Sequence, residues 1–544
     1  MTPRFIQVSG TWLKQLTIRM HTTGLVVSAG LMLTLLYNYA FFRNTFTTYT
    51  LTAGTLFFVL SLTVLLASSI SLVLLFVGSR RILKPLLIVL FLTSSVTAYF
   101  MDSYNIIIDT SMIQNIVSTN FQESTDLASV TLLFYLFILG IVPSIIIYRS
   151  EIIANPFKTE FLMRLKVGIV LLVLIAGQFA VFGKYYASFI REHKSLRYYT
   201  NPLTYMYSVI NYAGIMLNPK SGKITPVGLD AHVPDMDFKR ELIILVIGET
   251  ARADRFSLNG YARETNPLLS KENIINLSNV HSCGTTTAIS VPCMFSLFGK
   301  ASFSTKAANR TENLLDVLTH AGINILWRDN NSDSKGVATR VTYQDFKTPA
   351  LNPVCDIECR DEGMLSGLDD YIHQQSKGDI LIVLHQMGNH GPAYYKRYPA
   401  AFEKFKPVCK SINLNECSKE EINNAYDNAI LYTDYFLDKV INFLKQQTTE
   451  FETSMVYMSD HGESLSENGL YLHGMPYFLA PEEQKHVAAL LWFPENDTDV
   501  DIDKIKSYAN HAFSHDNLYH TILGILEIKS DVYDPRKDIS HLQE

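Results

Sequence analysis

Five long apolar segments occupy much of the first 190 residues, and they constrain the fold more than any other feature of the chain. Each approaches the roughly 20 apolar residues that a helix needs to cross a bilayer. The first has no clean small-residue cleavage site and further spans follow it, so we expect an uncleaved anchor rather than a signal peptide. We predict an N-terminal transmembrane domain of five helices over residues 1–190. The segments are Thr23–Phe41, Ala53–Val77, Pro85–Met101, Val130–Ile147 and Val167–Phe182.

The charges of the short loops predict how these spans are oriented. Lys and Arg gather before the first span, between the second and third, and between the fourth and fifth. The loop between the third and fourth spans instead carries Asp102, Asp109, Glu123 and Asp126, with no Lys or Arg. Because basic loops stay in the cytoplasm, an odd number of spans places everything after about Gly183 outside. We therefore expect a multi-pass protein of a bacterial inner membrane with its large C-terminal domain in the periplasm.

The rest of the chain divides into a linker and a globular domain. Residues 191–238 are rich in tyrosine, which favours the headgroup layer of a membrane, so we interpret them as interfacial helices and a linker. Residues 239–544 have the composition of a soluble globular domain. The formal net charge of −6 over 544 residues argues against a nucleic-acid partner. We expect a membrane-embedded monomer.

All six cysteines lie in the C-terminal domain. An even number confined to an external domain indicates disulfides. Although six cysteines allow 15 connectivities, their local clustering favours Cys283–Cys293, Cys355–Cys359 and Cys409–Cys417. The alternative for Cys355 and Cys359 is a zinc site, although no partner Cys or His pair is nearby.

The C-terminal domain has an α/β pattern, in which short apolar β-branched runs alternate with longer polar stretches. Such buried strands suit a mixed, mostly parallel sheet covered by helices on both faces. The helix-like stretches include Glu312–His320 and Glu420–Lys445. The candidate strands are Leu242–Ile247, Ile323–Trp327, Ile380–Leu384, Met455–Met458 and Ala488–Phe493.

Acidic residues and histidines follow three of these strands directly. Glu249 follows the first strand, His385 and His390 follow the third, and Asp460-His461 follow the fourth. In open α/β sheets the ligand crevice lies outside the carboxyl ends of the strands, so we expect one site there. Asp, Glu and His together suit Zn²⁺ or Mn²⁺ better than Ca²⁺ or Mg²⁺.

Each of these residues also has an ordinary structural interpretation. Glu249 is the kind of carboxylate that caps a helix N-terminus, and Asp460-His461 suit a turn. His473 suits a surface loop, and His385 suits a packing role, so we prefer His390 for the site.

A nucleophile is expected in the loop from Cys283 to Cys293. Its small residues, including the threonine triplet Thr285–Thr287, give way to an apolar helix-like run. A hydroxyl at that junction would lie at a helix N-terminus, where backbone N–H groups favour phosphate and a developing alkoxide. A Thr hydroxyl is a weak nucleophile at neutral pH, so it needs a metal or a base. The alternative is a Ser/Thr-rich loop with an N-cap threonine.

Several motifs in order resemble the lipid A phosphoethanolamine transferases of the EptA and mobile colistin-resistance type. The resemblance runs over essentially the whole chain and implies a catalytic domain of the alkaline phosphatase/sulfatase fold. The motifs are Gly248–Thr250, the Cys283–Ser296 loop, Trp327–Gly336, His385–Pro392 and Ser459–Glu463.

The resemblance assigns roles residue by residue. It implies that Thr287 is the nucleophile and that Zn²⁺ is held by Glu249, Thr287, Asp460 and His461. His390 and His473 match residues that serve a second metal or the substrate phosphate, and Lys335 matches a phosphate contact. A polar trio in the membrane half, Asn115, Thr119 and Glu123, matches residues that line the phosphoethanolamine site, and its spacing of four places it on one helical face. The family's disulfide pattern matches Cys283–Cys293 and Cys409–Cys417.

The implied reaction is zinc-dependent transfer of phosphoethanolamine from phosphatidylethanolamine to a lipid A phosphate through an adduct on Thr287. The added amines would weaken the attraction of the cell surface for cationic peptides such as polymyxin. Three alternatives remain: a phosphoglycerol transferase of the lipoteichoic-acid-synthase type, a phosphoethanolamine transferase with another acceptor, and a metal-dependent lipid-binding or sensory protein. A sulfatase is disfavoured because no Cys/Ser-x-Pro-x-Arg motif is present.

Overall fold

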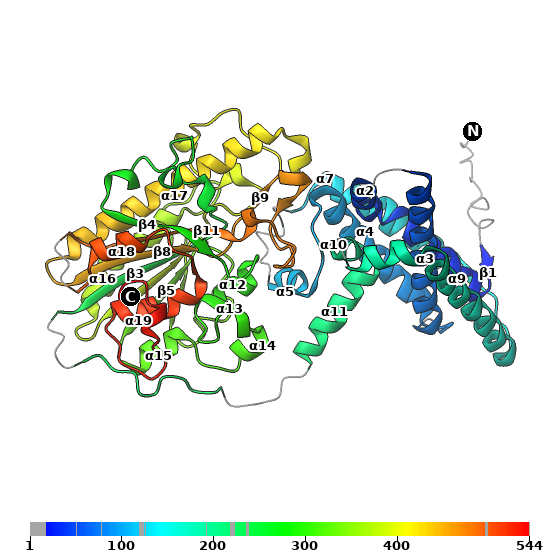
Figure 1. Cartoon of the computed structure of the whole chain (residues 1–544), viewed down its shortest axis with the longest axis horizontal. Helices are drawn as coiled ribbons and strands as arrows, with labels where there is room; N and C mark the ends of the chain where they lie inside the picture. Colours follow the sequence, from blue (N-terminus) through cyan, green and yellow to red (C-terminus); the bar gives the residue numbers. More distant parts are fainter. Residues whose placement is uncertain are drawn as a thin grey trace, which may run out of the picture. The chain divides into compact units, whose positions relative to one another are not determined.

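The computed structural model divides into two compact units, each described here by itself (Figure 1). The first comprises Met1–Asp109 and Ala128–Ile210, and the second comprises Thr110–Leu127 and Asn211–Glu544. The segment Thr110–Leu127, which lies between two long apolar helices in the sequence, therefore belongs to the second unit, called the catalytic unit below. The structure describes residues 18–49, 52–77, 79–118, 125, 127–191, 193–217, 224–234, 239–495 and 499–542.

The first unit consists of apolar helices. In the described part of the chain, four helices are long and apolar enough to cross a membrane, or five if a bent pair forms one span. This confirms four of the five predicted spans as single spans and replaces the first by the bent pair. The helices are α1 (Thr22–Leu36), α2 (Tyr39–Thr48), α3 (Ala53–Val77), α4 (Leu83–Tyr104), the continuous run α7 (Val130–Tyr135), η2 (Leu136–Ile141) and α8 (Val142–Arg149), then α9 (Phe157–Arg191) and α10 (Lys194–Arg197). Helix α11 (Leu203–Met216) begins in the first unit, and its residues from Asn211 onward belong to the second.

The first predicted span, Thr23–Phe41, is not one straight helix. Helices α1 and α2 are bent by 55° at a break that contains Asn38. The Asn38 side-chain amide donates to Leu33 O at 2.9 Å and to Asn201 O at 2.7 Å, and its oxygen accepts from Asn201 N at 2.8 Å. The buried asparagine thus satisfies backbone groups that a helix break exposes in an apolar environment.

The second unit is built on an eight-stranded mixed sheet of order β12-β4-β11-β8-β3-β7-β5-β6. Strand β11 pairs antiparallel with both neighbours and every other pairing is parallel, which confirms the predicted mostly parallel sheet. The strands are β3 (Glu241–Gly248), β4 (Ile274–His281), β5 (Asn324–Asp329), β6 (Thr342–Asp345), β7 (Ile380–His385), β8 (Glu452–Ser459), β11 (His486–Trp492) and β12 (Phe513–Ser514). Two-residue strands form small separate pairs: β1 (Arg19–Met20) with β2 (Glu151–Ile152), and β9 (Ser464–Leu465) with β10 (Tyr471–Leu472).

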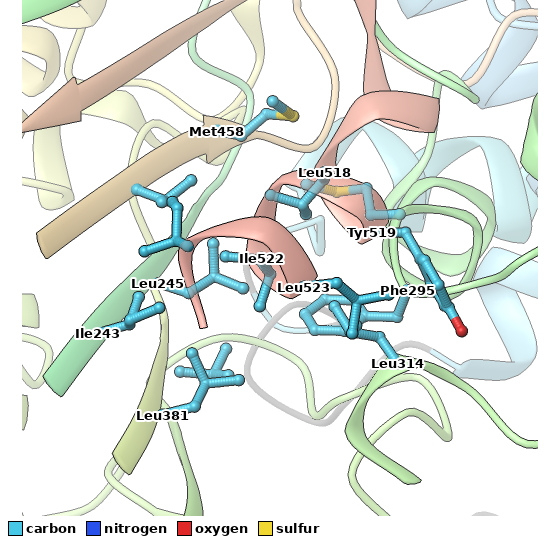
Figure 2. Close-up of a cluster of buried hydrophobic side chains, with 14 of the residues drawn as sticks. Ile243, Leu245, Phe295, Leu314, Leu381, Met458, Leu518, Tyr519, Ile522 and Leu523 are labelled. Atoms are coloured by element: carbon cyan, nitrogen blue, oxygen red, sulfur yellow. The ribbon is translucent and has the colours of Figure 1, made fainter. Parts of the chain in front are cut away.

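Helices cover both faces of the large sheet (Figure 1). The long helix α17 (Lys419–Gln447) crosses one face, while α15 (Leu314–His320) and α19 (Leu518–Ile525) cover the other. Figure 2 shows the core on this second face, where Ile243 and Leu245 of β3 meet Leu518 and Ile522 of α19. The remaining helices are α5 (Thr110–Ser118), α12 (Thr287–Met294), α13 (Gly299–Ser302), α14 (Thr305–Ala308), α16 (Leu368–Gln374) and α18 (Ile502–Tyr508).

Strand β4 was not among the strands that we predicted. Its sequence alternates apolar and polar residues, and only Ile275, Leu277 and Val280 join the core. Our search for continuous apolar runs therefore passed over it, because half-buried strands alternate instead. The edge strands β6 and β12 are short and carry too little pattern to be recognised.

Candidate active site

Two paired strands bring the first site residues together. In β3 and β8, which run parallel, Gly248 lies opposite Ser459. The next residue of each strand is therefore at the same edge of the sheet: Glu249 after β3 and Asp460 after β8. Glu249, Asp460 and His461 are fully buried and offer ligand atoms that all lie within 4.8 Å of one another.

Thr287 faces this cluster from helix α12. It is the first residue of the helix, after the extended N-cap residue Thr286. Its hydroxyl donates to Glu249 Oε2 at 3.2 Å and lies 3.3 Å from His461 Nε2. A buried hydroxyl at the positive end of a helix, beside a carboxylate and an imidazole, is well placed to become a nucleophile toward a phosphoryl group.

The other two threonines of the triplet are directed differently. Thr285 donates its hydroxyl to Met475 O at 2.6 Å, whereas the buried Thr286 hydroxyl has no hydrogen-bond partner among the residues that the structure describes. The loop is closed by the disulfide Cys283–Cys293, and Cys283 N donates to His515 Nδ1 at 3.1 Å. The geometry therefore distinguishes Thr287 from its neighbours.

All three disulfides have the pairing that the sequence favours. Besides the bridge across the Thr287 loop, the structure contains Cys355–Cys359 and Cys409–Cys417. The alternative of a zinc site at Cys355 and Cys359 is wrong, because these two cysteines are bonded to each other.

The tautomer of His461 follows from its partner. His461 Nδ1 lies 2.9 Å from the Gly462 carbonyl, which can only accept a hydrogen bond, so Nδ1 carries the proton. Burial lowers the pKa of His461 to about 4, so the ring is neutral at pH 7. Its Nε2 therefore presents a lone pair to the cluster.

The residues present fit a divalent metal ion. His461 Nε2 lies 3.2 Å from Asp460 Oδ2 and 3.5 Å from Glu249 Oε1. Asp460 Oδ2 is buried and has no hydrogen-bond partner within the described part of the chain. Two carboxylates and an imidazole lone pair that face one another without a shared proton need a positive charge among them. Two oxygens, one nitrogen and the Thr287 hydroxyl form a donor set that suits zinc.

Asn331 holds Glu249 in this arrangement, a role that we did not predict from the sequence. Its side-chain amide donates to Glu249 Oε2 at 2.7 Å and to Gln386 O at 2.9 Å. Asn331 itself is placed by β5, because its backbone N–H donates to Asp329 Oδ1 at 3.0 Å. Such outer partners fix the orientation of a metal-ligating side chain. In the sequence, Asn331 lies within the Trp327–Gly336 motif and two residues after the end of β5, but neither fact indicates that its amide reaches Glu249.

His390 and His473 lie beside the cluster. The His473 ring is 4.3 Å from the His461 ring and 5.7 Å from the His390 ring, measured between centroids. His473 Nδ1 lies 3.2 Å from Glu463 Oε2, and burial raises the pKa of this Glu463 carboxyl. Burial and the positive charge of Arg397 hold the pKa of His390 well below its usual range.

The remaining predicted residues are less closely grouped. Lys335 has a positive φ of 50°, its Nζ donates to Ser332 O at 2.7 Å, and its charge acts on His390. His385 is buried, and its Nδ1 lies 2.8 Å from Asp329 Oδ2. Asn115 lies on α5, in the same unit as Thr287, whereas Thr119 and Glu123 lie outside the described residues.

A second missed residue shapes the loop that carries His390. The buried carboxylate of Asp361 accepts from Met387 N at 2.8 Å, from Gly388 N at 3.1 Å and from the Asn330 amide at 2.8 Å. Burial raises the pKa of Asp361, while these three donors oppose that change. The residue lies far from any strand end in sequence, so no local pattern marks it.

Comparisons with known proteins cover both units. The family model described as Sulfatase matches residues 241–528, and the model described as Phosphoethanolamine transferase EptA/EptB matches residues 66–215. Phosphatidylethanolamine transferase Mcr-1 of Escherichia coli is 41% identical over 521 residues, which are 93% of this chain and 95% of that protein.

Solved structures agree with these matches. The integral membrane protein lipooligosaccharide phosphoethanolamine transferase A (EptA) from Neisseria meningitidis matches with a TM-score of 0.92 and 32% identity, over 96% of this chain and 99% of that chain. The C-terminal periplasmic domain of phosphoethanolamine transferase EptC from Campylobacter jejuni matches with a TM-score of 0.53 and 39% identity, over 59% of this chain and 99% of that chain. The chain therefore belongs to the EptA family of membrane-anchored phosphoethanolamine transferases.

Proposed function

We propose that this enzyme transfers phosphoethanolamine from phosphatidylethanolamine to a lipid A phosphate, with zinc as cofactor and a covalent adduct on Thr287 as intermediate. The observation that carries the proposal is the position of the Thr287 hydroxyl, 3.2 Å from Glu249 Oε2 and 3.3 Å from His461 Nε2 at a helix N-terminus. Both substrates are lipids, so a catalytic domain anchored at the periplasmic face of the inner membrane suits the reaction.

The zinc ion would be held by Glu249, Asp460, His461 and Thr287. When bound, it lowers the pKa of a coordinated hydroxyl and neutralises negative charge on phosphoryl oxygens. The chain's own contribution is to fix these ligands: Asn331 orients Glu249, and the Gly462 carbonyl fixes the His461 tautomer.

The first half-reaction exchanges one ester bond for another. A bond forms between Thr287 Oγ1 and the phosphorus of phosphatidylethanolamine, while the bond from phosphorus to the glycerol oxygen breaks. Thr287 gives up one proton and the departing diacylglycerol gains one. We assign protonation of the departing glycerol oxygen either to His473, whose Nδ1 lies 3.2 Å from Glu463 Oε2, or to His390, whose ring centroid lies 5.7 Å from that of His473.

In the second half-reaction the bond between phosphorus and Thr287 Oγ1 breaks, and a bond forms between phosphorus and an oxygen of the acceptor. A lipid A phosphate oxygen attacks the adduct, and Thr287 leaves and regains its proton. Lys335 supplies a positive charge toward the transferring group. The product carries additional amines, which would reduce the binding of cationic peptides such as polymyxin. Another phosphate or sugar acceptor is the alternative for this half-reaction.

Proteoliposomes test the whole proposal. Full-length zinc-loaded protein is reconstituted with phosphatidylethanolamine and lipid A, and both lipid products are measured by mass spectrometry. We expect diacylglycerol and phosphoethanolamine-modified lipid A from the parent and neither from Thr287→Ala. Thr286→Ala is the matched control, because it removes a neighbouring buried hydroxyl that makes no hydrogen bond to any described residue. Diacylglycerol release without modified lipid A would contradict the assignment of lipid A as the acceptor, while the assignment of phosphatidylethanolamine as the donor would still hold.

A further inference from the structure

Helix α12, which begins at Thr287, contains a proline in its interior. Pro292 lies four residues after Ala288, so it would normally donate its N–H to the Ala288 carbonyl. Proline has no N–H, and its ring crowds the carbonyl of the residue four positions earlier. The carbonyl that lies directly after the nucleophile therefore lacks its usual intrahelical donor.

A side chain from a distant part of the sequence donates to this carbonyl. Gln114 of α5 donates its side-chain amide to Ala288 O at 3.1 Å. The Gln114 oxygen in turn accepts from the Thr305 hydroxyl of α14 at 3.2 Å. Gln114 thus bridges two helices of the catalytic unit with both ends of its amide, at the one backbone acceptor that Pro292 leaves open.

A second contact of α5 is with the loop that carries His473. Met112 is buried, and a Cβ placed on Gly474 would lie only 2.3 Å from Met112 Cε. Gly474 has a φ of 88° and directly follows His473. The positive φ favours glycine at position 474, and the absence of a side chain there leaves room for the Met112 methyl group. Helix α5 is therefore fastened to the nucleophile helix by Gln114 and to the His473 loop by Met112.

We infer that Gln114 is a positioning residue that docks α5 on the Pro292-interrupted nucleophile helix and so sets the affinity for the donor lipid. The inference rests on the proposed function, because Asn115, the next residue of α5, belongs to the trio that the family resemblance matches to the phosphoethanolamine site. Docking through Gln114 fixes the distance between Asn115 and Thr287. Loss of docking should therefore weaken donor binding while leaving the chemistry at Thr287 intact.

The test measures diacylglycerol release by the full-length zinc-loaded protein in vesicles that contain a varied fraction of phosphatidylethanolamine in phosphatidylcholine. We expect Gln114→Ala to raise the KM for phosphatidylethanolamine roughly five-fold, the factor expected for one lost hydrogen bond, with kcat changed less than two-fold. Gln114→Glu should raise KM as much, because a carboxylate has no N–H for Ala288 O. Gln375→Ala is the matched control, since it removes another glutamine amide that donates to a helix carbonyl, that of Tyr371.

A double-mutant cycle and hydrogen exchange separate docking from a general structural effect. Thr305→Val should raise KM less than Gln114→Ala, and the double variant should be no worse than Gln114→Ala alone, because Thr305 acts through Gln114. Amide exchange of residues 110–118 should be faster in both single variants and unchanged in Gln375→Ala.

An unchanged KM with unchanged exchange, or a loss of kcat at constant KM, would overturn the inference. If the parent itself releases no diacylglycerol, the proposed function fails instead, and exchange of residues 110–118 alone then decides whether Gln114 docks the helix.

Discussion

The two ends of strands β3 and β8 both collect acidic residues, yet they differ as candidate sites. At the carboxyl ends lie Glu249 and Asp460 with His461, and at the amino ends Glu241 lies opposite Glu452, with Asp499 nearby. Each trio brings its ligand atoms within 4.8 Å of one another. Proximity of acidic groups alone therefore does not separate a catalytic site from a sheet end.

Burial and partners make the difference. The first trio is fully buried and faces the hydroxyl of Thr287. It also contains the His461 imidazole, whose Nε2 lone pair is directed at the two carboxylates. In the second trio only Glu241 is buried, and Asp499 is exposed to water. A solvated carboxylate can relieve repulsion by taking up a proton or a solvent cation, whereas a buried one must be paired in place. We therefore expect the end with Glu249, Asp460 and His461 to depend more strongly on a bound ion than the opposite end.

The largest expected effect is at the ligands themselves. Asp460→Asn removes a negative charge from the buried trio, so bound zinc and transfer activity should both fall, activity on the order of 100-fold or more. Metal content by elemental analysis and modified lipid A by mass spectrometry check this. Glu452→Gln at the opposite end should retain both, and equal zinc loss in the two variants would contradict the contrast.

A smaller effect is expected for the residue that orients a ligand. Asn331→Ala leaves Glu249 without its amide donor, so activity should fall about 10- to 100-fold. Zinc titration of the variant should show weaker binding while its melting temperature stays within a few degrees of the parent. If the variant kept the zinc affinity and activity of the parent, the proposed role of Asn331 in orienting the Glu249 carboxylate would be wrong.

Removal of zinc by a chelator should show which end of the strands binds the metal ion that stabilises the fold. Removal of zinc leaves the buried trio uncompensated, so the melting temperature should fall by several degrees and return when zinc is added back. Thermal unfolding followed by circular dichroism measures both steps. The Glu452→Gln variant should show the same loss and recovery as the parent, and a loss that disappears in this variant would place the stabilising metal at the wrong end of the sheet.

The smallest effect concerns pH at the amino end of the strands. Partial burial and the neighbouring Asp499 raise the pKa of Glu452 to about 7. A raised carboxyl pKa means that its stability contribution is fully present below the unfolded value near 4.5 and is lost as the pH rises through 7. Glu452→Gln should therefore raise the melting temperature at pH 8 by a degree or two and leave it unchanged at pH 4.5. A gain of equal size at both pH values would contradict the assigned ionisation.

The sheet and its catalytic edge were accessible from sequence because they depend on local signals. The continuous apolar run of β3 marks a buried parallel strand, and polar residues directly after such strands predict where a site forms. The alternating pattern of β4 and the bend at Asn38 were missed, since each depends on what packs beside it.

The contacts that hold the site together required the structure. Asn331 reaches Glu249 only because β5 and β3 are both anchored to β7, and Gln114 reaches Ala288 across 174 positions of sequence. No periodicity or spacing encodes such approaches. The choice of Thr287 within its triplet came from family resemblance, because the register of a threonine run cannot be read from composition.

The most direct test of the central claim is the mass of the intact zinc-loaded protein after incubation with phosphatidylethanolamine and no acceptor. The account predicts a gain equal to one phosphoethanolamine group, which peptide mapping places on Thr287, with equimolar diacylglycerol and no gain in Thr287→Ala. A gain on another residue, or diacylglycerol release in Thr287→Ala, would contradict it.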